Sequence, residues 1–475
     1  MKAYVPVLII TLIASVCGAQ TPITNKLLAV PAAAPDTWLT YHLAHPGPDK
    51  AIPADPNCAI FYKGRYHLHY IYQSNGFSFA HVSSTDMVHW KWHPTVLVPQ
   101  ANRHGMFSGT AFLTMEGKPA HAYCGWGSNR NWIQHALDDK LDKWSKPEVM
   151  LPSDETGKLM VNEPYFDPDV WIMDGRYYGL NGRSSHQSPL IMKSQNLKDW
   201  EHIGELLHPD FDEEKLGVKK EEDISCPNFF KLGDKWVLTC ISHRLGCRYF
   251  IGDFKDEKYL PEYHAVMGGN SRRYFAPESL QTPDGRRVNW SWFINGNGKD
   301  HRGTQSLPTE MSLNSKNQMR FRPIQELETL RHEKKEKSMI LVKSDVTQAI
   351  DDMLGDHCEI RLEIEKSGNK SFGIDVLCND EGTDGLRIQV NREKNLLEVG
   401  DQNGDFTLHS DERLSLRIFV DAGLVEVFAN EKQVVMADKK RPAGSKIKDR
   451  VALFSSGSDL LIDRLSFWKM KSAYN

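Results

Sequence analysis

The stretch Ala54–Tyr72, ADPNCAIFYKGRYHLHYIY, decides the fold because it carries a complete β-hairpin signal. A Lys-Gly turn at Gly64 is followed by alternating aromatic and polar residues, which is the two-residue period of a β-strand. Ahead of the turn, Asp55 opens an Asp-Pro-Asn sequence, which is ordinary turn chemistry. The stretch therefore predicts a hairpin whose first strand begins at an acidic side chain.

The same pattern recurs four more times at an even spacing. In each case a turn glycine is followed by alternating or apolar residues, and successive glycines are 53, 58, 58 and 52 residues apart. Five like units of this size predict a five-bladed β-propeller, because one long β-sandwich would not explain the spacing. The turn glycines are Gly64, Gly117, Gly175, Gly233 and Gly285.

Beyond the fifth unit the pattern changes. A charged, helix-prone stretch covers residues 323–337, and short alternating segments follow to the end of the chain. These segments predict a second all-β domain, most simply a two-sheet sandwich. We therefore expect an all-β protein, a five-bladed β-propeller followed by a C-terminal β-sandwich. The expected ranges are a signal segment (1–19), propeller (35–325), linker (326–337) and sandwich (338–475).

Composition narrows the class of protein. The net charge of −4 does not indicate nucleic-acid binding. The sequence does not indicate an oligomeric state. A short positive start, a 12-residue apolar run and small residues predict a signal peptide cleaved near Ala19. No other segment is apolar enough to span a bilayer, so we expect a secreted, soluble protein. Of the eight cysteines, Cys17 precedes that cleavage, and the other seven should be buried thiols or form one incidental disulfide.

Acidic residues precede three of the predicted inner strands at nearly one position. Asp55, Asp167 and Asp223 lie 9, 8 and 10 residues ahead of their turn glycines, and Glu221 and Glu222 adjoin Asp223. A propeller brings the starts of its inner strands together around a central channel. Because two carboxylates suffice to hydrolyse a glycosidic bond, this pattern predicts a glycosidase that needs no cofactor or metal.

The chain resembles glycoside hydrolase family 32, the levanase- and invertase-like β-fructosidases, in a clan with families 43 and 68. The resemblance rests on the Asp55 stretch and on motifs in the family's order. It implies that Asp55 is the nucleophile, Asp167 the transition-state stabiliser, and a β-fructoside the substrate, cleaved with retention. The further motifs are FAHVSSTDMVHW (79–90), MFSGTAF (106–112), FDPDV (166–170), SCPNFF (225–230) and IFVDAGLVEVFANEKQVV (418–435).

Substrate contacts follow from the same motifs. The resemblance places five residues at the sugar, but Phe166 stands where the family keeps an arginine and Phe79 where it keeps a tryptophan. Replacing a guanidinium by an aromatic ring is not conservative, so an arabinoside or galactoside remains an alternative substrate. The five residues are Asn57, Phe79, Phe107, Ser108 and Phe166.

The general acid departs from the family pattern. It should precede Cys226 directly, but Ser225 is there, and a serine hydroxyl is too weakly acidic to protonate a leaving group. Strand alternation favours Asp223 as its substitute, followed by Glu222 and then Glu221. If none of them serves, the protein binds carbohydrate without cleaving it. His67 and His69 share a strand face, but without a third ligand in view the pair predicts packing and no metal.

Overall fold

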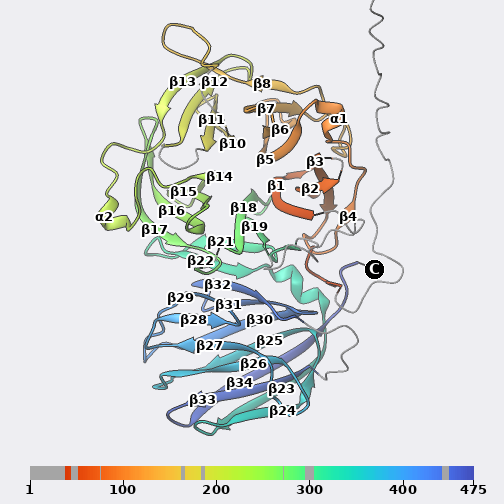
Figure 1. Cartoon of the computed structure of the whole chain (residues 1–475), viewed down its shortest axis with the longest axis vertical. Coiled ribbons are helices and arrows are strands. Elements are labelled where there is room, and N and C mark those ends of the chain that lie inside the picture. The colour runs from red at the N-terminus through yellow and green to blue at the C-terminus, as the bar shows by residue number, and fades with distance from the viewer. Residues whose placement is uncertain are drawn as a thin grey trace, which may run out of the picture.

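A computed structural model of the chain describes residues 38–43, 52–74, 76–161, 166–182, 188–270, 272–294, 304–440 and 449–474. These residues form two β-rich bodies, drawn one above the other in Figure 1. The predicted signal segment 1–19 lies outside the described residues. None of the helices in the described ranges is long and apolar enough to cross a membrane.

The N-terminal body consists of five sheets of four or five strands each. Blade 1 contains β1 (Ile52–Tyr62), β2 (Arg65–Ser74), β3 (Gly76–Ser84) and β4 (Lys91–Trp92). Blade 2 contains β5 (Gly105–Leu113), β6 (Pro119–Trp126), β7 (Arg130–His135) and β8 (Glu148–Met150). Blade 3 contains β9 (Pro152–Ser153), β10 (Phe166–Met173), β11 (Arg176–Gly182), β12 (Leu190–Ser194) and β13 (Trp200–Glu205).

Two more blades complete this body. Blade 4 contains β14 (Ser225–Leu232), β15 (Lys235–Ser242), β16 (Gly246–Lys255) and β17 (Lys258–Val266). Blade 5 contains β18 (Tyr274–Gln281), β19 (Arg287–Phe293), β20 (Thr304–Gln305), β21 (Thr309–Leu313) and β22 (Met319–Pro323). Strands β1, β5, β10, β14 and β18 contact one another in a closed ring, so the predicted five-bladed arrangement is confirmed.

In every blade the predicted glycine turn connects the innermost strand to the strand paired with it. All five glycines adopt positive φ values, between 61° and 87°, which only glycine adopts without strain. Two short helices, α1 (Pro99–Asn102) and α2 (Glu213–Leu216), lie in loops. The local signal of a glycine turn between alternating segments was thus sufficient to locate every blade.

The inner strands are bulged where they face the channel. Pairing shifts register next to Cys58, Asp167, Cys226 and Ala276, whose φ values are 52°, 41°, 47° and 45°. In β5 the shift falls at Ser108, between Phe107 and Gly109. A bulge re-aims the side chain at its centre. The shared bulge therefore gives five different blades a residue directed by the same backbone device.

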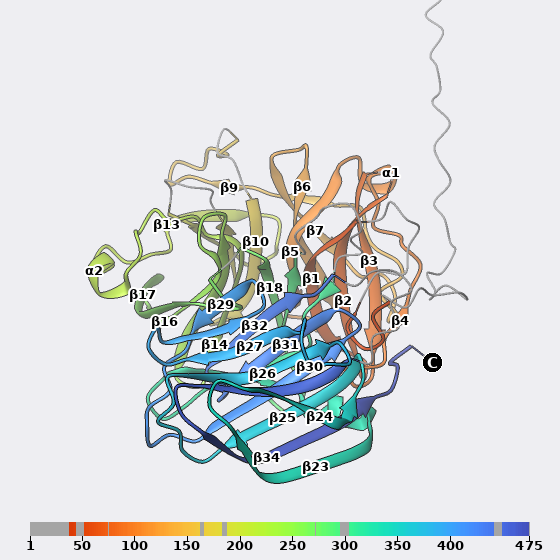
Figure 2. The same cartoon turned by 60° about the horizontal axis from the view of Figure 1, so that its bottom comes forward.

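The C-terminal body is a sandwich of two six-stranded sheets, visible as two layers in Figure 2. Alternate aliphatic residues of both sheets form its buried core. The first sheet has the order β23 (Arg331–Val342), β34 (Leu460–Met470), β25 (His357–Ile364), β30 (Leu414–Asp421), β31 (Leu424–Ala429) and β32 (Gln433–Asp438). The second has the order β24 (Thr347–Leu354), β33 (Arg450–Ser456), β26 (Ser371–Cys378), β27 (Leu386–Asn391), β28 (Leu396–Val399) and β29 (Gln402–Asp405).

The predicted linker is shorter than expected. Residues 325–330 form the 3-10 helix η1 (Gln325–Leu330), but residues 331–337 belong to β23, which pairs with β34. The charged run that suggested a solvated linker is an edge strand. Charged side chains suit such an edge because they block pairing with another chain.

The two bodies share one buried core. It joins Trp290 and Phe321 of the propeller to Phe419 and Phe428 of the sandwich. The sandwich residue Asp421 accepts hydrogen bonds from the backbone nitrogens of residues 40–42 at 2.7–3.0 Å. The segment ahead of the propeller is thereby attached to the sandwich.

The cysteines of the described ranges are all free thiols, and six of the seven are buried. Cys17 lies outside those ranges. The expectation of buried thiols is therefore met where the chain is described, with Cys226 half-buried at the channel.

Candidate active site

The starts of the inner strands meet in a small pocket at one end of the channel. The lining comes from all five blades, as the propeller geometry requires. It combines carboxylates with prolines that follow the bulged residues. The lining residues are Pro56, Asn57, Ser108, Gly109, Thr110, Asp167, Pro168, Cys226, Pro227, Pro277 and Glu278.

Asp55 is buried next to the lining residues Asn57 and Ser108, and the neighbouring blade holds it. The Ser108 hydroxyl donates to its Oδ2 at 2.7 Å. Asn57 donates to the Asp55 carbonyl at 2.7 Å, and the Gly109 amide donates to the Asn57 side chain at 2.7 Å. Burial raises the pKa of Asp55, and the Ser108 hydrogen bond acts in the opposite direction. The carboxylate is fixed in position by strands β1 and β5 together.

Asp167 enters the pocket from β10 at a bulge position. Its Oδ2 accepts the Cys226 amide at 2.9 Å. The Cys226 sulfur lies 3.7 Å from Oδ2 of Asp167, 3.7 Å from Oδ2 of Asp55 and 3.5 Å from Ser108 Oγ. One thiol therefore contacts both carboxylates, which brings the two acids close together.

The proximity of the two acids affects their protonation. Burial raises the pKa of Asp167 to about 6, and the nearby charges of Asp55 and Asp223 act in the same direction. Burial also raises the pKa of the Cys226 thiol well above its usual range. Cys226 is thus an uncharged thiol between the two acids. Because the charge of Asp55 acts on Asp167, the two acids influence each other's titration.

Asp223 lies beside this pocket and forms a pair with a histidine. Its Oδ1 accepts the Ser225 hydroxyl at 2.7 Å, and its Oδ2 lies 2.5 Å from His243 Nδ1. The His243 amide also donates to Oδ2, at 2.8 Å. The hydrogen bond to Asp223 raises the pKa of His243. The hydrogen bonds from His243 and Ser225 lower the pKa of Asp223, although burial acts in the opposite direction.

The His243 side chain is 71% exposed, so its ring is open to solvent. Nδ1 faces Asp223, which leaves Nε2 as the ring nitrogen available to another molecule. The charge of His243 also acts on Asp55 and Asp167. His243 therefore offers Nε2 to solvent at a position from which its charge acts on both acids.

Glu222 is occupied elsewhere. Its carboxylate accepts hydrogen bonds from the Ser242 hydroxyl and from the Arg244 guanidinium. These partners lower its pKa against burial. Of the predicted substitutes for the general acid, Asp223 acts through its charge on Asp167, whereas Glu222 pairs with Arg244 and Glu221 is exposed.

The predicted sugar contacts divide into two groups. Phe166 and Phe107 are half-buried, at the start of β10 and in β5, and both have surface to offer a ligand. Asn57 and Ser108 are buried and hold Asp55. Phe79 is 0% exposed and packs with Leu97 in a hydrophobic cluster, so the prediction that it contacts sugar is not supported.

Sequence reasoning missed an aromatic group next to Phe107. The rings of Phe77 and Trp126 lie 5.3 and 5.0 Å from that of Phe107, and Trp126 is 55% exposed. It also missed His243, which pairing of β14 with β15 brings to Asp223 from 20 residues away. Neither the aromatic group nor His243 lies in a recognisable local motif. Only knowledge of which strands pair would have indicated them.

Comparison with known proteins bears on this arrangement. The model of the glycosyl hydrolases family 32 N-terminal domain matches residues 45–323, and that of the family 32 C-terminal domain matches residues 326–469. The chain belongs to glycosyl hydrolase family 32. The two matched ranges meet at η1, where the propeller ends and the sandwich begins.

Relatives of this family 32 chain include two sucrose-6-phosphate hydrolases. That of Zymomonas mobilis is 25% identical over 478 residues, covering 88% of this chain and 90% of the relative. That of Klebsiella pneumoniae is 26% identical over 456 residues, covering 86% and 90%. Both alignments run through propeller and sandwich.

Solved structures support the fold. The fructan 1-exohydrolase IIa of Cichorium intybus superposes with a TM-score of 0.76 at 17% identity, covering 92% of this chain and 98% of that chain. The exo-inulinase of Aspergillus awamori gives 0.75 at 19% identity, covering 94% and 100%. The family 32 architecture is thus preserved at low sequence identity.

Proposed function

We infer that the protein is an exported retaining glycosidase that hydrolyses β-fructosides. The observation that carries this proposal is the contact of Cys226 Sγ with both Asp55 and Asp167, since two neighbouring carboxylates are what glycoside hydrolysis needs. The family, the sucrose-6-phosphate hydrolases among the relatives and the fructan hydrolases among the structures favour a fructoside. The predicted signal segment supports export.

The proposed reaction has two steps. Asp55 attacks the anomeric carbon, the bond to the leaving oxygen breaks, and a covalent glycosyl-enzyme forms. Water then displaces Asp55 at the same carbon and restores the carboxylate. Asp167 stabilises the positive charge that develops on the sugar in both steps. Ser108 supports this role of Asp55 by holding Oδ2 in place.

We assign the proton to the Asp223–His243 pair. Ser225 cannot supply it, and Glu222 is engaged by Arg244. Asp223 orients His243 and keeps its imidazolium protonated, so Nε2 gives a proton to the leaving oxygen in the first step. In the second step Nε2 takes a proton from the attacking water. The sequence favoured Asp223 itself as the general acid; the proposal adds His243 as the residue that transfers the proton.

A first test compares turnover of sucrose, inulin, levan and aryl fructosides by wild type and variants. Asp55→Asn should abolish all turnover, because the nucleophile is lost. His243→Gln and Asp223→Asn should lower kcat on sucrose by about 10²–10⁴-fold. Their loss should be much smaller on an aryl fructoside, whose leaving group needs no proton.

The matched control is Asp210→Asn, an acid with an 82% exposed side chain in the loop before β14, which should behave as wild type. Equal losses on sucrose and the aryl fructoside would exclude the Asp223–His243 pair as proton donor. Aryl arabinosides and galactosides belong in the same panel, since Phe166 replaces a charged sugar contact. Turnover of one of these without any fructoside would reassign the substrate.

A second candidate function is carbohydrate binding without catalysis. Ser225 motivates it, because the expected acid is missing at that position. It predicts that an oligosaccharide binds in calorimetry while no glycoside in the panel is cleaved. Any turnover that depends on Asp55 rules it out.

A further inference from the structure

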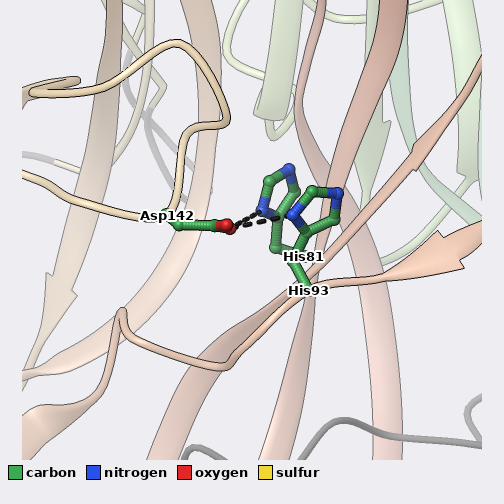
Figure 3. A group of neighbouring side chains, drawn as sticks. All are labelled: His81, His93 and Asp142. Carbon is green, nitrogen blue, oxygen red and sulfur yellow. Dashed lines mark hydrogen bonds and ion pairs between the residues drawn. The ribbon is translucent and has the colours of Figure 1, made fainter.

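A second cluster of ionisable side chains lies away from the pocket, between blades 1 and 2. His81 comes from β3, His93 follows β4, and Asp142 lies in the loop between β7 and β8 (Figure 3). Asp142 Oδ1 is 2.8 Å from His93 Nδ1 and 3.4 Å from His81 Nδ1. All three donor atoms lie within 4.8 Å of one another. Two histidines thus direct the same ring nitrogen at one carboxylate.

The far side of each ring is already held. His81 Nε2 lies 2.9 Å from His67 Nδ1, and His93 Nε2 lies 2.7 Å from Ser83 Oγ. Histidines that bind a metal usually donate their other ring N–H to such a partner, which fixes the orientation of the ring. The partners here lie on the side of each ring away from Asp142.

One donor atom in this cluster is left without a hydrogen bond. His81 is 3% exposed, and its buried Nδ1 has no hydrogen-bond partner in the described structure. A buried nitrogen without a partner normally requires an explanation.

The separations suit a small cation. Zinc bonds to histidine nitrogen and carboxylate oxygen are about 2.0–2.2 Å, which puts tetrahedral ligand atoms about 3.3–3.5 Å apart. The 3.4 Å contact already has that value, and the 2.8 Å contact must open by about half an ångström or slightly more. Two imidazoles disfavour Ca²⁺ and Mg²⁺, which prefer oxygen ligands.

We propose that His81, His93 and Asp142 bind Zn²⁺ through two Nδ1 atoms and one carboxylate oxygen, with water as fourth ligand. The Asp142 side chain is 22% exposed, so the ion and the water have a path from solvent. Metal binding at Nδ1 requires the His93 tautomer that carries its proton on Nε2. This Nε2–H then donates a hydrogen bond to the Ser83 hydroxyl oxygen. The ion connects the β7–β8 loop of blade 2 to blade 1, and its role is to stabilise that contact.

This site differs from the sequence prediction about histidines. His67 and His69 were expected to be packing residues without a third ligand. His69 does pack, with its ring stacked on that of His81 at 4.4 Å, and His67 supports His81. The ligands themselves are 12 and 49 residues apart in the chain, so no local spacing indicated them.

The test measures metal on the full-length protein. Wild type, Asp142→Asn, His93→Gln and the control Asp139→Asn are stripped with chelator, dialysed against Zn²⁺ and analysed for metal content. Asp139 lies in the same loop with a 68% exposed side chain and pairs with Lys63. We expect one Zn²⁺ per chain in wild type and Asp139→Asn, and none retained in the other two variants.

Two further measurements separate binding from folding. Added Zn²⁺ should raise the Tm of wild type and Asp139→Asn but leave that of Asp142→Asn unchanged, with near-identical circular dichroism for all. Ser83→Ala removes the support of His93, together with the hydrogen bond that Ser83 accepts from Arg65 Nε, and should weaken Zn²⁺ binding by about 10–100-fold. Co²⁺ should give a visible absorption band in wild type that Asp142→Asn lacks.

Two results would overturn the proposal. If wild type retains no Zn²⁺ and its Tm does not respond, the three residues form only a hydrogen-bonded contact between blades. If Asp142→Asn and His93→Gln bind as much Zn²⁺ as wild type, the ion is bound elsewhere. Neither readout involves turnover, so the outcome is independent of the function proposed above.

Discussion

Single residues of the pocket set the expected pH dependence. The Asp55–Asp167 pair must be ionised for attack, and the pKa of Asp167 is raised to about 6. His243 must be protonated, and its pKa is raised above 6.5 by Asp223. We therefore expect kcat/KM to rise with pH through about 6 and to fall again at a pH above 6.5, a bell-shaped profile measured on sucrose.

The variant His243→Gln makes this profile diagnostic. It should lose the alkaline limb, because no group then has to stay protonated. The acid limb should remain and move slightly upward, since the His243 charge lowers the pKa of Asp55. An alkaline limb identical to that of wild type would assign it to another group.

The sequence predicts the residues of the pocket only where the motif is local. Asp55 and Asp167 each lie at the start of a recognisable strand, so the sequence alone is enough to single them out as candidates. His243 reaches Asp223 only because β14 and β15 pair, and Cys226 reaches both acids only because three blades converge. Such contacts depend on long-range geometry that a short motif does not contain.

At the level of elements, the bulge in β5 has little room for change. A Cβ on Gly109 would lie 2.2 Å from the Ala122 carbonyl oxygen and 2.5 Å from Tyr123 Cα, both backbone atoms. Gly109→Ala should therefore lower the free energy of unfolding by about 1–3 kcal/mol or more. It should also lower kcat, because the Gly109 amide holds Asn57. Denaturant unfolding and sucrose turnover measure the two effects.

The matched control is Gly368→Ala. Gly368 has open space around its would-be Cβ and no left-handed φ, so alanine should leave stability unchanged or slightly higher. Equal stability of the two variants would mean that β5 can move away from β6 without penalty.

Elements were predictable where turn chemistry and alternation agree. All five hairpins carry both signals, and all five are present. Strand β23 was assigned to a linker because its first half is charged and helix-prone. Its strand conformation comes from pairing with β34, more than 120 residues later, and tertiary pairing overrides such a local preference.

At the level of the whole molecule, one buried ion pair connects the N-terminal segment to the sandwich. His42 Nδ1 lies 3.0 Å from Asp421 Oδ2, its Nε2 lies 3.3 Å from Glu426 Oε2, and all three side chains are fully buried. Glu426 also accepts the Leu307 amide of the propeller at 2.9 Å. The pair therefore contributes to both the attachment of the segment and the contact between the two bodies.

This pair should make stability depend on pH. Its carboxylates raise the pKa of His42 to about 9 against the effect of burial, and His42 lowers the pKa of Asp421 against burial. The stabilisation from His42 is fully present below pH 6.5 and is lost as pH rises through 9. That from Asp421 is present above pH 3.8 and is lost at lower pH.

His42→Gln should lower the free energy of unfolding by about 3–5 kcal/mol near pH 6, because it leaves buried carboxylates without a cation. The difference from wild type should shrink steadily between pH 6.5 and 9, which thermal unfolding over that range measures. His89→Gln is the control, since His89 pairs with Asp86 at 49% exposure and contributes little. A His42→Gln deficit that stays constant up to pH 10 would show that the ring is neutral in the fold and that its contribution is packing alone.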